Sequence, residues 1–275
     1  MTGILAMLGA SLCFSTGGIL IKLIPWNPLA INGVRNLIAS CVIGAFILIT
    51  HHKIKWNLTV LTGAVCMAGV TTFYTIANKL TSAGNAIVLQ YTAPVWIILL
   101  MALIFGRKPG RREILAILIV LAGIICFFFE GMSTGNLLGD LTALLSGIFY
   151  AGVFMLNQFE KGDALSSMFF GQLMCGIFLS PFAVKETRFT PLILTAVILL
   201  GTVQVGLAYI LFSIGTKYTD PVTASILNAI EPIMNPILVA VFYGERLGGL
   251  SLTGAVIVIG GVLFYNVMST ARSNP

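Results

Sequence analysis

A row of polar side chains crosses an otherwise apolar run of the chain, from Pro221 to Phe242. Its members are Ser225, Asn228, Glu231 and Asn235, which follow one another at intervals of three, three and four residues. At about 100° per residue these side chains share one stripe of a helix. A carboxylate at membrane depth costs about 2.5–3.5 kcal/mol or more, so it usually faces a cavity or a partner. We therefore predict that Glu231 lies beside a polar cavity; the alternative is a packed helix whose Asn and Glu side chains make structural hydrogen bonds.

Three chemical roles are open to Glu231. Without a partner, burial favours the protonated carboxyl, and the residue is then a candidate proton carrier. Paired with Arg35 or Lys22, it stays ionised and stabilises one conformation. The third role is direct binding of a substrate ammonium group.

Two cationic residues also lie inside apolar runs, Lys22 near the end of the first run and Arg35 about two turns into the second. In the structural interpretation, both long side chains extend to the membrane surface and place their charges in water. In the functional interpretation, Arg35 or Lys22 presents positive charge at the outer mouth of a cavity. Such a charge favours an anionic group such as a carboxylate.

Further polar and aromatic side chains occur at cavity-plausible depth in other apolar runs. They are Tyr74, Asn78, Gln90, Tyr91, Tyr150, Gln204 and Tyr209. The spacing of Thr71, Tyr74 and Asn78 puts these three residues on one helix face. Together with Asn228 and Asn235, the set is our candidate for substrate binding or coupling. For any single aromatic residue, ordinary packing or a place in the interfacial belt is the alternative.

Three prolines are expected to break helices: Pro94, Pro232 and Pro236. Proline has no backbone N–H, so it interrupts the hydrogen-bond ladder of a helix interior. Pro232 and Pro236 do so at the depth of Glu231, which strengthens the expectation of a cavity there.

The composition places the chain in a membrane. Of its 275 residues, 58% are hydrophobic and only 9% are charged, whereas soluble domains carry about 25% charged residues. The net charge of +6 is not a nucleic-acid signal, because no basic patch with interleaved aromatic residues is present. The five cysteines all lie in apolar segments without a CxxC pair, and the two histidines are adjacent in a loop. We expect no disulfide, metal or cofactor.

Ten apolar segments of membrane-spanning length can be read from the sequence, joined by short connections that contain Pro or Gly. They are Gly3–Ile24, Pro28–Thr50, Leu58–Asn78, Ala83–Phe105, Glu113–Phe129, Leu138–Leu156, Ser166–Val184, Leu192–Ile214, Pro221–Tyr243 and Ser251–Met268. No connection is long enough for a soluble domain. The predicted fold is therefore an all-α membrane protein with ten transmembrane helices.

The loop charges predict the orientation of these helices. With the N-terminus inside, the inner loops hold nine cationic residues: Lys53, Lys55, Arg107, Lys108, Arg111, Arg112, Lys161, Lys217 and Arg272. The outer loops hold four: Lys79, Lys185, Arg188 and Arg246. This asymmetry favours both termini in the cytoplasm of a protein that is integral to the cytoplasmic membrane.

The two halves of the chain resemble each other. A shift of 138 positions superposes Pro94 on Pro232, and the same shift pairs Gln90 with Asn228 and Gly106 with Gly244. We expect one integral membrane unit of two five-helix repeats, residues 1–136 and 137–275. Because five is odd, the second copy enters the membrane upside down, which is the inverted-repeat architecture of secondary transporters.

In the order of these features the sequence resembles the drug/metabolite transporter superfamily, in its ten-helix EamA branch. The opening helix has Phe14, the small-residue patch Ser15–Gly18 and Lys22. The next helix begins with Pro28-Leu29-Ala30 and contains Arg35. The Pro94 and Pro232 helices follow, and Gly244-Glu245-Arg246-Leu247 resembles the Gly-Glu-Arg-Leu turn of the family. The resemblance covers essentially the whole chain, although Arg107-Lys108-Pro109 replaces that turn in the first half and Gln172 lies near the position that corresponds to Arg35.

The resemblance implies a transporter of small organic metabolites, in many relatives an exporter of amino acids or related compounds. We therefore predict a secondary transporter that works by alternating access, with an uptake carrier of the same fold as the alternative. An intramembrane enzyme is the weaker alternative, because paired catalytic acids, HExxH and phosphate-binding loops do not occur in the sequence. The expected partners are a small-molecule substrate and the lipid bilayer, with no nucleic acid, and proton coupling is a candidate.

Overall fold

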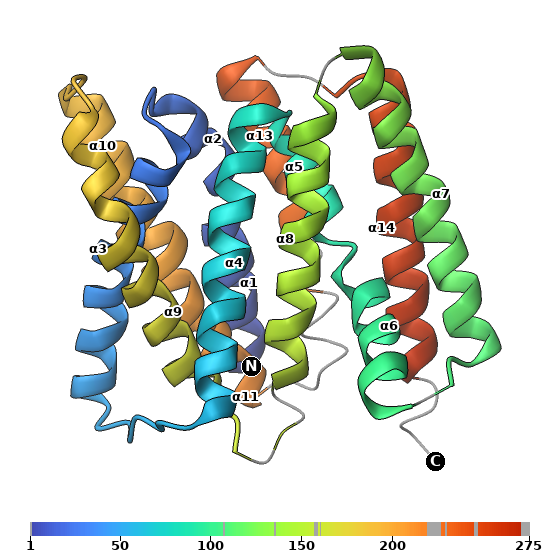
Figure 1. Cartoon of the computed structure of the whole chain (residues 1–275), viewed down its shortest axis with the longest axis horizontal. Helices are drawn as coiled ribbons and strands as arrows, with labels where there is room; N and C mark the ends of the chain where they lie inside the picture. The colour runs from blue at the N-terminus through green and yellow to red at the C-terminus, as the bar shows by residue number, and fades with distance from the viewer. Residues whose placement is uncertain are drawn as a thin grey trace.

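The computed structural model describes residues 2–106, 108–134, 136–156, 159, 161–218, 227–228, 230–244 and 247–270, and this part of the chain is helical with short connections (Figure 1). In chain order its elements are α1 (Thr2–Ser15), α2 (Gly17–Leu23), α3 (Pro28–Ile49), α4 (Leu58–Leu80), α5 (Ala83–Gln90), α6 (Ala93–Phe105), α7 (Arg111–Thr134), α8 (Leu137–Leu156), α9 (Ala164–Leu179), the 3₁₀-helix η1 (Ser180–Lys185), α10 (Pro191–Leu199), the π-helical η2 (Leu200–Leu207), α11 (Ala208–Tyr218), α13 (Glu231–Tyr243) and α14 (Gly249–Thr270).

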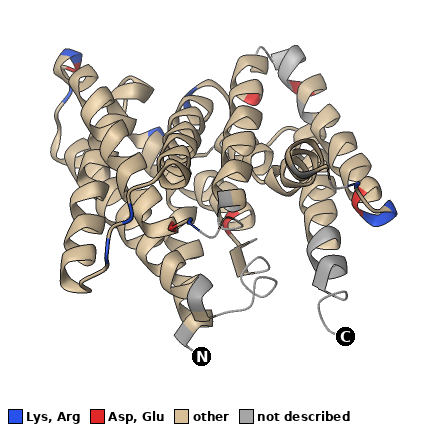
Figure 2. Cartoon of the chain, turned by 60° about the horizontal axis from the view of Figure 1, so that its bottom comes forward, with Lys and Arg blue, Asp and Glu red and all other residues tan. Residues whose placement is uncertain are grey.

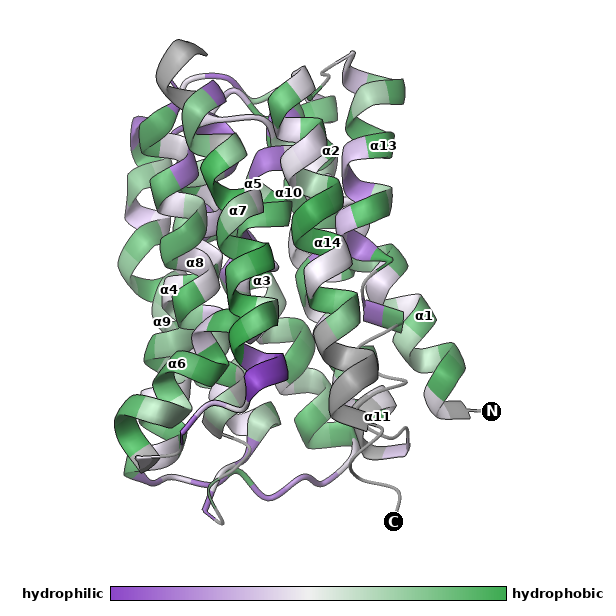
Figure 3. Ribbon diagram, turned by 90° about the vertical axis from the view of Figure 1, so that its right-hand side faces the viewer, coloured by the Kyte–Doolittle hydropathy of each residue, from purple (hydrophilic) through white to green (hydrophobic). Residues whose placement is uncertain are grey.

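The helices form a membrane-spanning bundle. In the described part of the chain, seven segments are long and apolar enough to cross a bilayer, and three shorter apolar helices are Leu137–Val153, Glu231–Tyr243 and Gly249–Phe264. Each predicted segment overlaps one of these helices. Hydrophobic residues run along the outer helices α7 and α14 in Figure 3, and acidic and basic residues are sparse along the helices in Figure 2. The protein is thus an integral membrane protein.

The connections end and restart helices by local chemistry. The side chains of Asn27, Asn57, Ser82 and Asp163 each accept a hydrogen bond from a backbone N–H of the helix that follows. These caps satisfy donors that have no partner within the first helical turn. Pro28 and Pro191 stand in the first turns of α3 and α10, where a missing N–H costs little.

The shift of 138 positions found in the sequence also relates helix boundaries. Helix α6 spans Ala93–Phe105 and α13 spans Glu231–Tyr243, so both bounds differ by 138. Each helix is followed by a glycine in the left-handed region, Gly106 at φ 63° and Gly244 at φ 75°. A residue with a Cβ atom is strained in that conformation, so glycine ends both helices in the same way.

The last helices of the two halves run in opposite directions. In Figure 1, α7 rises from the lower end of the bundle to the upper end, whereas α14 descends toward the C-terminus. The two helices pack along each other. Elsewhere α4 packs against α8 and α9, α3 packs against α9, and α1 packs against α11.

Two of the expected proline breaks coincide with helix starts. Pro94 is the second residue of α6 and Pro232 is the second residue of α13. Pro236, however, lies inside α13, which continues to Tyr243, so the helix does not end at this proline. The reason is that Pro236 removes a single hydrogen bond close to the start of the helix, where few bonds have formed. Ser225, Arg107 and the Glu245-Arg246 pair lie outside the described residues.

Candidate functional site

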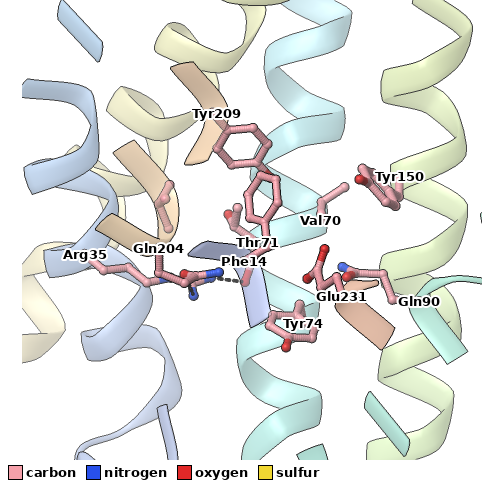
Figure 4. A pocket seen from close by; sticks show the side chains of 11 residues that line it. Phe14, Arg35, Val70, Thr71, Tyr74, Gln90, Tyr150, Gln204, Tyr209 and Glu231 are labelled. Carbon is pink, nitrogen blue, oxygen red and sulfur yellow. Dashed lines mark hydrogen bonds between the residues drawn. The ribbon is translucent and has the colours of Figure 1, made fainter. Parts of the chain in front are cut away.

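A small cavity lies among helices from both halves of the chain (Figure 4). It is lined by Phe14, Arg35, Val70, Thr71, Tyr74, Gln90, Tyr150, Gln204, Val205, Tyr209 and Glu231. Its volume is about 30 Å³, and a water molecule needs about 10–15 Å³ measured in this way. In this conformation the cavity therefore has room for about two water molecules and not for an organic solute.

Glu231 supplies the acidic wall of the cavity. It is the first residue of α13 and is 7% exposed. The Tyr91 hydroxyl donates a hydrogen bond of 2.6 Å to Glu231 Oε2 and lies 3.1 Å from the Asn228 carbonyl oxygen. Tyr91 stands in the break between α5 and α6, so the interruption before Pro94 places the phenol next to the start of the matching helix in the other half.

Arg35 supplies the basic wall on the other side of the cavity (Figure 4). The side chain is 1% exposed, so it does not extend to the membrane surface. Its Nε and Nη2 atoms donate to Asn32 Oδ1 at 3.2 and 3.0 Å, and Nη2 also donates to the Thr71 carbonyl at 3.1 Å. Nη1 makes a longer contact of 3.4 Å with Gln204 Oε1. All these acceptors are neutral, so the positive charge is not compensated by a carboxylate among the described residues.

Arg35 and Glu231 thus face one cavity without forming an ion pair with each other. Buried charges normally pair or bind a ligand, because removing a charge from water is costly. A cavity with a guanidinium on one wall and a carboxyl on the other can bind a small molecule of complementary charges.

Other predicted residues complete the walls. Gln90 donates to Ser146 Oγ at 2.6 Å, and the Ser146 hydroxyl donates to the Val70 carbonyl at 3.0 Å, which joins α5, α8 and α4. Gln204 lies in the π-helical η2, where the wider turn interrupts the regular helix beside the cavity. Tyr209 packs edge-on against Phe14 with ring centroids 4.9 Å apart. The rings of Tyr150 and Tyr91 are also edge-on, with centroids 6.3 Å apart.

Three predicted asparagines lie behind or beside the lining. Asn235 donates to the Tyr74 hydroxyl at 3.0 Å, and its Oδ1 atom has no partner in the described part of the chain. The Oδ1 atom of Asn228 and both amide atoms of Asn78 are also buried without hydrogen bonds there. Buried amides without partners are rare in folded proteins, so this region keeps polar capacity for a ligand, water or another conformation.

Lys22 is placed elsewhere. It does not line the cavity, and its Nζ atom donates to the Thr81 carbonyl at 2.9 Å, at the turn between α4 and α5. Lys79 donates in a similar way to the Ile24 carbonyl. In this conformation, therefore, both lysines bind backbone carbonyls at the ends of helices, Lys22 after α4 and Lys79 after α2.

Four of the lining residues are not among the site residues predicted from the sequence: Phe14, Val70, Thr71 and Val205. Thr71 could have been found, because it shares a helix face with Tyr74 and Asn78. Val70 and Val205 carry no chemical signal, and apolar side chains of this kind are indistinguishable from core residues in a sequence. Phe14 entered only as part of the family resemblance.

Comparison with known proteins gives the family. The family model described as "EamA-like transporter family" matches residues 1–129 and again residues 137–267. The chain belongs to the EamA-like transporter family. The double match accords with the repeated helix boundaries, since α6 belongs to the first matched region and α13 to the second. The protein is accordingly a transporter.

Relatives of this EamA-like transporter are also named as transporters. An "Uncharacterized transporter" of Archaeoglobus fulgidus is 28% identical over 194 residues, which are 69% of this chain and 69% of the relative. The "Uncharacterized inner membrane transporter YedA" of Escherichia coli is 32% identical over 131 residues, 46% of this chain and 42% of the relative. A crystal structure named only as that of a protein aligns over 97% of both chains with a TM-score of 0.65 at 19% identity, which shows a shared fold.

Proposed function

We propose that this EamA-like transporter is a secondary transporter of an amino acid or a related small zwitterion, and that it works by alternating access. The observation that carries the proposal is the pair of buried ionisable side chains, Arg35 and Glu231, on one cavity without an ion pair between them. A zwitterion presents a carboxylate and an ammonium group at a short separation. It would satisfy both walls at once, whereas a neutral solute would leave the Arg35 charge buried without a counter-charge.

The two walls offer different chemistry to such a solute. The Arg35 guanidinium can bind a carboxylate through charge-assisted hydrogen bonds. The Glu231 carboxyl, held by Tyr91 at 2.6 Å, can accept from an ammonium group or carry a proton when the substrate has left. Proton coupling is therefore part of the proposal, with Glu231 exchanging a proton for the substrate ammonium.

Alternating access is supported by the size of the cavity and by the repeat. At about 30 Å³ the cavity excludes an amino acid, so helices must move before a substrate can enter. The helix breaks at Tyr91–Thr92 and before Glu231 lie beside the charged walls. Rocking of two inverted five-helix units, residues 1–136 and 137–275, about this point would expose the walls to each side in turn.

The direction of transport and the orientation belong to the same proposal. Export is preferred to uptake on family resemblance, with both termini in the cytoplasm and the bundle in the cytoplasmic membrane. One relative is named an inner membrane transporter, which supports that location.

Substrate counterflow in proteoliposomes tests the proposed substrate class. The purified protein is reconstituted with one of the L-amino acids inside, and uptake of the same radiolabelled amino acid is measured for each member of the panel. We expect counterflow for a subset of the panel and its loss in Arg35→Gln. Arg112→Gln makes the same Arg-to-Gln substitution at an exposed position in the first turn of α7. It serves as the control and should retain wild-type exchange. Counterflow in none of the amino acids, or wild-type exchange by Arg35→Gln, would contradict the proposal.

A further inference from the structure

Asn32 lies one helical turn before Arg35 on α3 and is fully buried, at 0% exposed. Its Oδ1 atom accepts hydrogen bonds from three N–H donors of the same helix. They are Arg35 Nη2 at 3.0 Å, Arg35 Nε at 3.2 Å and Asn36 Nδ2 at 2.8 Å. The Thr75 hydroxyl lies 3.3 Å away, but it donates its one hydrogen to the Thr71 carbonyl at 2.7 Å. On its other side the Asn32 Nδ2 atom donates to Thr72 Oγ1 at 2.9 Å, which orients the amide. The neutral Asn32 Oδ1 atom is therefore the shared acceptor for the Arg35 and Asn36 side chains.

This arrangement divides the guanidinium of Arg35 into two edges. The Nε and Nη2 atoms face Asn32, and Nη2 is also bound by the Thr71 carbonyl at 3.1 Å. Nη1 carries two N–H groups, and its contact with Gln204 Oε1 is the longest of the set at 3.4 Å. Because both Arg35 and Gln204 line the cavity, Nη1 is the atom that a carboxylate can reach.

The identity of residue 32 decides how much positive charge that carboxylate meets. An acceptor that collects three N–H donors, two of them from a guanidinium, is a position at which aspartate would bind more strongly than asparagine. Aspartate would form a buried ion pair with Arg35 and neutralise it before any substrate arrives. The asparagine amide supplies the same geometry without the negative charge.

We infer that Asn32 is a positioning residue that sets the charge specificity of the site. It holds one edge of the Arg35 guanidinium with a neutral oxygen, so that the other edge keeps an uncompensated charge for the substrate carboxylate. The inference rests on the proposed function, because it names the residue on which recognition of a carboxylate by Arg35 depends.

The test compares Asn32→Asp with Asn32→Ala, two variants that differ in charge. Proteoliposomes are assayed with the L-amino acids that the wild type exchanges and with the carboxamide of each, and KM and Vmax are measured separately. We expect the preference for the carboxylate over the carboxamide, taken as the ratio of their KM values, to fall about tenfold or more in Asn32→Asp. In Asn32→Ala the guanidinium keeps its charge, so the preference should persist even if Vmax falls.

Two controls separate positioning from structural damage. Asn36→Asp adds the same charge one turn further along α3, where the amide contacts Asn32 Oδ1 and Thr71 Oγ1 but not the guanidinium, and should lower the preference less than Asn32→Asp. In an Arg35→Gln background, where exchange is expected to be lost, binding is measured by thermal stabilisation of the purified protein, and Asn32→Asp should cause no further loss of preference, because its effect passes through Arg35.

The outcomes also separate this inference from the proposed function. A wild type that does not prefer carboxylates overturns the proposed substrate class, and the inference with it. A wild type that does prefer them, with an unchanged preference in Asn32→Asp or equal losses in Asn32→Asp and Asn32→Ala, overturns the inference alone. If Asn32→Asp does not fold, a loss of preference in the correctly folded Asn32→Ala contradicts it.

Discussion

At the scale of single residues, the site is defined by two ionisable side chains whose charged forms are costly to bury. Arg35 and Glu231 are 1% and 7% exposed, and each is held by neutral partners in the described structure. Neutral hydrogen bonds offset only part of the cost of burying a charge. A site of this kind favours binding of a charged ligand over staying empty, which is the physical basis of the proposed function.

Replacing Glu231 with Gln tests the acidic wall. The substitution keeps the size of the side chain and removes its ionisable carboxyl, so we expect transport to be abolished or uncoupled from a proton gradient. The amount of folded protein in membranes should stay at the wild-type level. Flux into vesicles is measured across a range of pH, with and without an imposed proton gradient. Glu113→Gln, in the first turn of α7, is the matched control, and wild-type flux from Glu231→Gln at every pH would remove this residue from the mechanism.

At the scale of elements, the turn between α4 and α5 is tied to α8 by one buried acid. Asp140 is 0% exposed, and its Oδ1 atom accepts from Thr81 Oγ1 at 2.8 Å and from Asn85 Nδ2 at 3.1 Å. Thr81 also binds Lys22 of α2 through its carbonyl. This small cluster therefore connects three elements at one end of the bundle.

Asp140→Ala should destabilise that connection. The substitution leaves the Thr81 hydroxyl and the Asn85 amide without an acceptor, and a buried donor without a partner costs about 1–3 kcal/mol. We expect a lower midpoint of thermal unfolding in detergent, measured by the fluorescence of a thiol-reactive dye or by loss of monodispersity. Thr142→Ala, at a half-buried position of the same helix whose hydroxyl bonds only to carbonyls of that helix, should leave the midpoint nearly unchanged. Equal midpoints for the two variants would show that the cluster contributes little to stability.

Close helix packing provides a second prediction at this scale. A Cβ atom added to Gly33 of α3 would lie 2.2 Å from the backbone at Leu179 and Ser180, where α9 ends, whereas one added to Gly260 of α14 would meet nothing within 4 Å. Because backbone atoms cannot rotate away, Gly33→Ala should cost about 1–3 kcal/mol of stability or more. Gly260→Ala should be neutral or slightly stabilising, since alanine favours a helix. The two unfolding midpoints in detergent decide this, and a Gly33→Ala protein as stable as Gly260→Ala would contradict the close approach.

At the scale of the whole molecule, the ends of α3 identify the two faces of the bundle. The Asn27 N–H that precedes the helix donates to Glu186 Oε1 at 2.7 Å, so Lys185 lies near its start, while Lys53 follows its end at Ile49. A helix of 22 residues spans about 33 Å, enough to cross the hydrocarbon core. The loop charges predict that Lys53 is cytoplasmic and Lys185 is external.

Cysteine labelling tests this orientation. In a background without the five native cysteines, Lys185→Cys should react with a membrane-impermeant maleimide in intact cells. Lys53→Cys should react only after the membrane is permeabilised. The reverse pattern would invert the predicted topology, and labelling of both positions in intact cells would contradict a single orientation.

Much of the fold could be predicted from the sequence by itself. Apolar length gives the transmembrane segments, because lipid cannot satisfy backbone hydrogen bonds and helices satisfy their own. The shift that pairs Pro94 with Pro232 gives the repeat, since proline and glycine restrict the backbone in the same way in both halves. Those local rules act within a few residues, so they can be read without knowing the neighbours.

Only the tertiary structure decided which polar residues meet. Arg35 was expected either at the membrane surface or in a cavity, and packing between α3 and α4 places it in the cavity wall, where it donates to the Thr71 carbonyl. Tyr91 was one of several aromatic candidates until the break between α5 and α6 placed its hydroxyl on Glu231. Lys22, equally plausible in sequence, binds Thr81 instead. Such contacts join residues 36 to 140 positions apart, and the periodicity of one helix contains no information about which face of another helix it meets.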